Sequence, residues 1–186
     1  MTRSAVLEMN LSQFLAWEGD QPERYEFYRG KAFALGSGTA RHNRTVLNLA
    51  KRIGDHLSGS RCQVFATRIK AQAAEGVFYP DVMVTCGKAD AGDESTVNDP
   101  VLIVEVSSIT DGYDKRDKFD IYRTLTSLRE FVLIDPQRRR AESYTLSEHG
   151  RWLRSNRREG SALRLTSIDL TVPLVAVFDG LVTGQA

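Results

Sequence analysis

Two carboxylates of this chain lie in apolar stretches where an unpaired charge would be costly. Asp81 follows Pro80 in the run YPDVMVT, and Glu105 lies inside VLIVEVSS, the most apolar segment of the sequence. A carboxylate buried in such surroundings needs a cation or hydrogen-bond donors to offset the loss of water. A hard divalent cation such as Mg²⁺ or Mn²⁺ takes oxygen ligands from one or two carboxylates. The two acids therefore predict a metal site.

The segment after Glu105 supplies a charge of the opposite sign. Asp114, Lys118 and Tyr122 are spaced four residues apart, which places them on one face of a helix. Leu125 continues that face with an apolar side chain, so we expect the face to pack on the sheet and to bring Lys118 near both acids. A metal-activated water, with a lysine that orients it or stabilises developing charge, is the chemistry of phosphodiester hydrolysis.

Hydrophobic periodicity predicts the elements that must position these residues. Helices are expected over 11–19, 39–57 and 113–125, and strands over RYEFYR, KAFAL, CQVFATRIKAQ, VFYPDVMVTC, VLIVEVSS and EFVLID. A strand, a crossover helix and a second apolar strand predict a βαβ unit with a parallel pair. Residues 138–165 are expected to add antiparallel strands at the edge. The sum is an α/β (α+β) fold, one mixed β-sheet flanked by helices.

Length and composition are typical of a single globular domain over residues 1–186. Hydrophobic residues make up 41% and charged residues 26%, and the net charge is +1 from 25 basic and 24 acidic residues. Any DNA contact must therefore come from local clustering of charge. No stretch reaches the roughly 20 apolar residues of a membrane helix, and no signal-peptide pattern is present. We expect a cytoplasmic protein with no membrane partner.

The two cysteines, Cys62 and Cys86, are too few for a disulfide framework and lack the spacing of a zinc site. Thiols of this kind are usually buried and reduced in the cytosol. We interpret both as free, mostly buried thiols.

The order of the chemistry-bearing segments resembles the Uma2 family, which belongs to the PD-(D/E)XK nuclease superfamily. The resemblance covers roughly residues 10–178 and rests on RYEFYRGKAF, RHN, YPD, PVLIVEVSS, DKRDKFDIY and REFVLID. It implies a restriction-endonuclease-like fold and Mg²⁺- or Mn²⁺-dependent hydrolysis of DNA. The metal ligands that it implies are Asp81, Glu105 and the backbone carbonyl of Val106. Glu26 would be the acid that precedes the core motif, and His42 a polar residue near the site.

One position departs from the superfamily's usual pattern. The lysine normally stands two residues after the glutamate, where this chain has Ser107. Uma2-like chains carry the lysine on the following helix, and Lys118 matches that position. The leading hypothesis is therefore an endodeoxyribonuclease (a hydrolase). The alternative is a catalytically inactive nuclease-fold protein that acts as a binding or assembly module.

Each candidate residue also has a structural interpretation. Asp81 would pair with Arg68 at a strand edge, and Glu105 would form a structural salt bridge with Lys118 in an unrelated α/β domain. In the structural interpretation Glu26 would face solvent, His42 would be a core or helix-capping residue, and Tyr122 would only pack in the core.

The C-terminal third of the sequence is basic. Residues 137–165 carry eight arginines and three acids, so 8 − 3 = +5. These arginines would bind nucleic-acid phosphates, or they would form the solvated face of edge strands. The candidates for DNA contact are Arg138, Arg139, Arg140 and Arg154. A homodimer is a further expectation, since cutting both strands of a duplex needs two sites.

Overall fold

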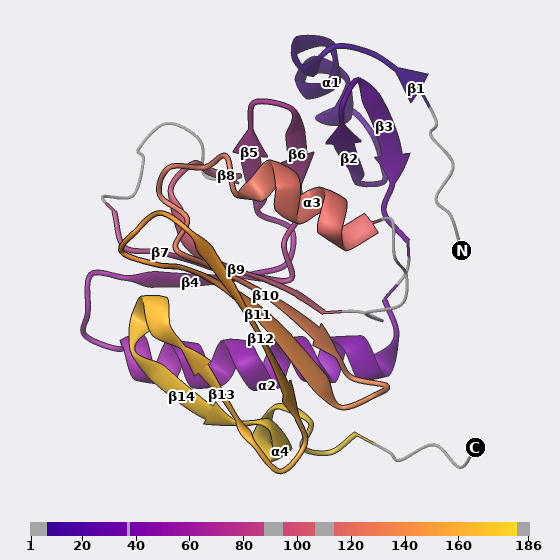
Figure 1. Cartoon of the computed structure of the whole chain (residues 1–186). Coiled ribbons are helices and arrows are strands. Elements are labelled where there is room, and N and C mark those ends of the chain that lie inside the picture. The colour runs from indigo at the N-terminus through magenta and orange to yellow at the C-terminus, as the bar shows by residue number, and fades with distance from the viewer. Residues whose placement is uncertain (1–6, 37, 88–94, 107–113, 182–186) are drawn as a thin grey trace.

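The protein is described by a computed structural model that covers residues 7–36, 38–87, 95–106 and 114–181, with side chains from Asp117 onward in the last range. Figure 1 shows the arrangement of its elements. The helices of these ranges are α1 (Leu11–Glu18), α2 (Ala40–Leu57), α3 (Asp114–Tyr122), α4 (Leu174–Val177) and the short 3-10 helix η1 (Thr166–Ile168). Among them, no helix is both long and apolar enough to cross a membrane.

The central sheet has six strands in the order β12-β11-β10-β9-β7-β4. Their bounds are β4 (Gln63–Ala66), β7 (Val82–Thr85), β9 (Pro100–Val106), β10 (Glu130–Asp135), β11 (Arg140–Leu146) and β12 (Trp152–Arg158). The strands β9 and β10 are parallel, with Glu105 opposite Leu133, and the other neighbours are antiparallel. The predicted βαβ unit is therefore formed by β9, α3 and β10, and the tail adds β11 and β12 at the edge.

A second sheet, which we call the N-terminal sheet, has six strands in the order β1-β3-β2-β6-β5-β8. Their bounds are β1 (Leu7–Glu8), β2 (Tyr25–Tyr28), β3 (Lys31–Ala34), β5 (Lys70–Ala73), β6 (Gly76–Phe78) and β8 (Thr96–Val97). The hairpin β2–β3 is the predicted RYEFYR–KAFAL pair. A separate two-stranded ribbon consists of β13 (Ala162–Leu165) and β14 (Leu170–Pro173).

The expectation of a single sheet was wrong, because two predicted strands each divide between the two sheets. The first breaks at Thr67 and Arg68, whose φ angles of 55° and 62° turn the chain out of the central sheet. The second breaks at Pro80, which has no backbone N–H for a strand ladder. The amide of Thr67 donates to the carbonyl of Asp81 at 3.1 Å, so the two breaks lie side by side. Asp81 is therefore located where the chain passes from one sheet to the other.

Helices cover both faces of the central sheet (Figure 1). The apolar face of α2 packs on one side, against alternate residues of β7, β9 and β10, and the ribbon β13–β14 and α4 close the same core. The helix α3 packs on the other side through Phe119, Ile121 and Tyr122. Since strand residues alternate between faces, Ile103 and Glu105 both face α3.

The cysteines form a disulfide bond, so the interpretation as free thiols was wrong. Cys62 immediately precedes β4 and Cys86 immediately follows β7, and their sulfurs are bonded. In the antiparallel register Gln63 lies opposite Thr85, which places the two cysteines directly across from one another. Residue spacing along the chain carries no information on this register.

Candidate active site

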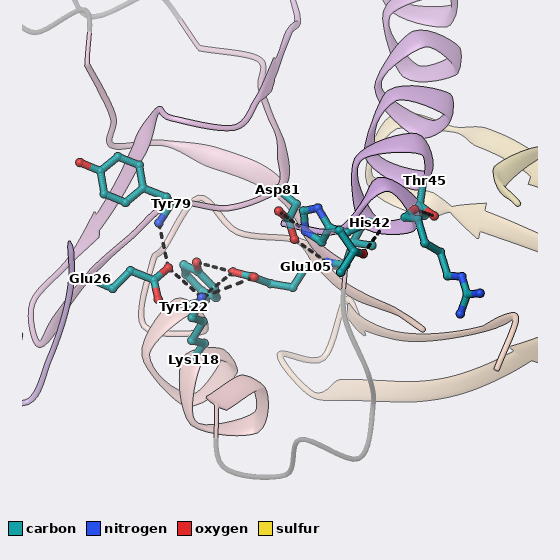
Figure 2. Close-up of polar contacts among 11 residues, drawn as sticks. Glu26, His42, Thr45, Tyr79, Asp81, Glu105, Lys118 and Tyr122 are labelled. Atoms are coloured by element: carbon teal, nitrogen blue, oxygen red, sulfur yellow. Dashed lines mark hydrogen bonds and ion pairs between the residues drawn. The ribbon is translucent and has the colours of Figure 1, made fainter. Parts of the chain in front are cut away.

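Five elements bring polar side chains together at the junction of the two sheets (Figure 2). Glu26 comes from β2, Asp81 from the break before β7, and Glu105 from β9. Lys118 comes from α3, and His42 comes from the first turns of α2. These five predicted site residues are thus neighbours in space although residues 26 and 118 are separated by about half of the chain.

A buried ammonium group lies between two buried carboxylates. The Nζ of Lys118 donates to Oε1 of Glu26 at 2.8 Å and to Oε1 of Glu105 at 3.4 Å. The exposed fractions are 6% for Lys118, 2% for Glu26 and 5% for Glu105. The ring of Phe78 lies 5.4 Å below the ammonium, a distance at which the ring face attracts a cation. One positive charge thus partly balances two negative charges that have left water.

Tyr122 is a second donor to Glu105. Its hydroxyl donates to Oε1 of Glu105 at 2.9 Å, and the side chain is fully buried. Burial raises the pKa of Tyr122 well above its ordinary value of 10.0, and the negative charges of Glu105 and Glu26 raise it further. The phenol therefore stays protonated and donates. The helical spacing of 118 and 122 predicted that both side chains face the sheet, as they do.

Among the described residues the carboxylate of Asp81 has two partners, and neither is Arg68. Its Oδ2 accepts from the backbone N–H of Val106 at 2.7 Å, and its Oδ1 lies 2.9 Å from Nε2 of His42. His42 is held at the start of α2, because the side chain of Thr39 caps the helix by accepting from the His42 amide at 3.1 Å. The carboxylate is thus tied to both β9 and α2.

Sequence reasoning missed Tyr79, which connects the site to a third buried carboxylate, that of Glu18. Its backbone N–H donates to Oε1 of Glu26 at 3.2 Å, and its hydroxyl donates to Oε1 of Glu18 at 2.6 Å. Lys70 lies 3.2 Å from the other oxygen of Glu18. Burial and the hydrogen bond to Glu18 raise the pKa of the Tyr79 phenol. The only signal in the sequence was its position directly before the Pro80-Asp81 pair.

Asp81 and Glu105 are the two acids that the sequence predicted as metal ligands. Asp81 directly precedes β7 and Glu105 lies on the neighbouring strand β9. Mg²⁺ commonly binds one or two carboxylates and completes its shell with water. Glu26 is engaged by Lys118 and Tyr79, so it stands on the lysine side of the site. Within the described ranges no cluster of three or more acidic, histidine or cysteine side chains could hold a metal.

The structure describes the remaining predicted residues to different extents. Ser107 and the side chain of Asp114 lie outside the described residues. Arg154 pairs with Glu142 at 2.7 Å, and the hydrogen bond to Glu142 raises the pKa of Arg154. Arg138 and Arg139 lie in the turn that follows β10, and Arg140 is the first residue of β11.

The fold and the arrangement of these side chains define a protein with a nuclease-like fold. A family model described as "Putative restriction endonuclease", Uma2, matches residues 11–174. The chain belongs to the Uma2 family, so the predicted membership is confirmed, and with it the fold class.

Two proteins of one organism and one solved structure are similar to this chain. The uncharacterized protein slr1290 of Synechocystis sp. is 29% identical over 94% of this chain and 93% of its own. The uncharacterized protein sll1609 of the same organism is 33% identical over 78% of this chain and 85% of its own. A crystal structure from Anabaena variabilis, described as a "putative nuclease belonging to DUF820", superposes with a TM-score of 0.75. It covers 91% of this chain and 97% of its own at 15% identity, which supports the shared fold.

Proposed function

We propose that this protein is a Mg²⁺- or Mn²⁺-dependent endonuclease that hydrolyses phosphodiester bonds in DNA. The observation that carries the proposal is the buried ammonium of Lys118, in contact with Glu26 and Glu105 beside a second metal-ligating candidate, Asp81. Apolar strands rarely hold such charges for stability alone, since replacing a buried ion network with apolar groups is often neutral or stabilising.

The residues of the site would perform three tasks: they would hold the metal, act on the attacking water or the phosphate, and orient the metal ligands. Asp81 and Glu105 would hold the metal, together with the Val106 carbonyl. In an extended strand the N–H and C=O of one residue point the same way, so we expect this carbonyl to face Asp81, as the N–H does. A bound metal would supply an activated water and polarise the phosphate.

Lys118 would act on the attacking water or the phosphate, and Tyr122 and His42 would orient the metal ligands. The Lys118 ammonium would orient the attacking water or stabilise charge on the phosphate in the transition state. Tyr122 would fix the rotamer of Glu105, and His42 that of Asp81, because each makes a hydrogen-bond-length contact with its carboxylate. Such partners of ligating groups commonly affect metal affinity or activity by about 10–100-fold.

Nicking of supercoiled plasmid tests the proposal. The wild type is expected to cut with Mg²⁺ or Mn²⁺ and not with EDTA, and Asp81→Asn and Glu105→Gln are expected to lose activity by roughly 100-fold or more. Asp55→Asn is the matched control, because Asp55 is an exposed acid near the far end of α2. Equal cutting by the wild type and Asp81→Asn would show that the activity belongs to a contaminant.

The rival function is a nuclease-fold module without catalysis. The observation that favours it is the ion pair of Lys118 with Glu26 and Glu105, which offsets buried charge without a metal. Calorimetric titration with Mn²⁺ separates the two functions. Binding that Asp81→Asn abolishes supports the nuclease, and a folded wild type that binds no Mn²⁺ at millimolar concentration supports the module.

A further inference from the structure

Two arginines lie directly opposite each other on neighbouring strands. Arg140 of β11 is paired in register with Arg158 of β12. Like charges at opposed positions of an antiparallel pair are destabilising. Within the described residues neither guanidinium makes an ion pair or a side-chain hydrogen bond. The sheet thus holds two unbalanced positive charges at one point.

The arginines around this pair are already balanced. Arg138 lies 3.2 Å from Asp135, and Arg139 lies 2.6 Å from Glu159 and over the ring of Phe178. All four arginines line one open depression of about 460 Å³, together with Gln137 and Glu159. The depression therefore has an excess of positive charge, which comes from Arg140 and Arg158.

Strand register places this pair on the same face of the central sheet as Glu105. Glu105 lies opposite Leu133, which lies opposite Glu142. Arg140 is two residues from Glu142 on β11, so both side chains point to that face. With strands about 4.8 Å apart, Arg140 is two strands, or about 10 Å, across the sheet from β9.

Arg140 also lies at the strand ends where the acidic site is located. In the strand register Arg140 lies opposite Asp135, the last residue of β10. Glu105 is likewise next to the last residue of β9. Glu142 lies between the two sites, but Arg154 neutralises it at 2.7 Å. Asp135, opposite Arg140, faces the same way and lies 3.2 Å from Arg138. Both carboxylates between the two sites therefore have a guanidinium partner.

We propose that Arg140 and Arg158 bind backbone phosphates of a DNA strand whose scissile phosphate lies at Asp81 and Glu105, an inference that rests on the proposed function. Guanidinium groups bind phosphate oxygens in a bidentate manner, and a bound phosphate relieves the repulsion between the two arginines. Protection of an exposed strand edge explains charge on β12. It does not explain Arg140, because β11 is an interior strand and the side chain is partly buried.

The proposal is tested by measuring DNA binding under conditions that exclude metal-dependent cleavage. Fluorescence anisotropy in EDTA measures the affinity for a labelled DNA duplex and for the corresponding single strand over a range of salt. The R140A/R158A variant is expected to bind the duplex ~10-fold more weakly. The slope of log K against log salt is expected to fall by about 0.9 for each lost phosphate contact, or about 1.8 for both, and by about 0.7 each for a single strand.

Two further variants make the result specific. R157A is the matched control, because Arg157 is the neighbouring residue on β12, is exposed and points to the opposite face, across from Ala141. R140K/R158K keeps both charges and is expected to keep the salt slope. Thermal unfolding should show no loss of stability in R140A/R158A, since repulsion is removed; if it unfolds, R140Q/R158Q takes its place in the same assay.

The outcomes separate this inference from the proposed function. Unchanged affinity in R140A/R158A, or an equal loss in R157A, overturns the arginine-pair proposal even if the wild type cuts DNA. Loss of binding confined to R140A/R158A supports phosphate binding by the arginine pair. If the wild type then cuts nothing, the endonuclease proposal fails, and the pair is a DNA-binding site without a scissile phosphate at Asp81 and Glu105.

Discussion

Replacement of Lys118 by methionine tests the central feature of the site. The substitution keeps the length of the side chain but removes the ammonium that contacts Glu26 and Glu105. All three residues are at most 6% exposed, so water cannot take the place of the ammonium without rearrangement. Breaking a buried pair in this way costs about 3–5 kcal/mol of the free energy of unfolding, because a carboxylate stays buried without its counter-charge.

This loss in the free energy of unfolding corresponds to a measurable decrease in Tm. For a chain of 186 residues, 1 kcal/mol corresponds to about 2–4 °C in Tm, so K118M is expected to lose roughly 6–20 °C. The remaining hydrogen bonds from Tyr122 to Glu105 and from Tyr79 to Glu26 favour the lower end. E26Q/K118M is expected to lose less than K118M, because only one buried carboxylate then lacks its counter-charge.

Urea and thermal denaturation, with and without Mn²⁺, measure these changes. K51M is the control, because the Lys51–Asp55 pair is exposed and pairs of that kind contribute less than ~1 kcal/mol. Mn²⁺ at 100 times its Kd adds about 2.7 kcal/mol and is expected to restore part of the K118M loss. The reasoning is refuted if K118M is as stable as K51M, since Lys118 would then not compensate two buried acids.

Two further predictions concern stability. Because the Tyr122 pKa is raised above 10.0, the unfolded chain releases this proton at lower pH than the folded protein. The contribution of Tyr122 to the free energy of unfolding should therefore be constant below pH 10 and should fall above it by up to about 1.4 kcal/mol per pH unit. Y122F should reduce the slope above pH 10 in urea titrations, and an unchanged slope contradicts the assignment. C62A/C86A, or reduction of the wild type, should lower the free energy of unfolding by about 2–4 kcal/mol for a separation of 24 residues, whereas equal stability with and without dithiothreitol would contradict this contribution of the disulfide.

Local spacing in the sequence predicted much of the site. A helical period of 3.6 places residues four apart on one face, so Lys118 and Tyr122 were expected to point at the sheet together, and both contact Glu105. An acid inside an apolar strand needs a partner wherever that strand packs. These inferences hold regardless of topology because they depend only on neighbours along the chain.

Strand register and the path of the chain between sheets were decided by tertiary structure alone. The break at Thr67 and Pro80, the disulfide between Cys62 and Cys86, and the opposition of Arg140 and Arg158 all depend on which strands pair and in which register. That choice minimises the free energy of the whole core, in which one residue of slip moves every side chain to the other face. The sequence thus determined which groups need a partner, and the tertiary structure determined which partner each received.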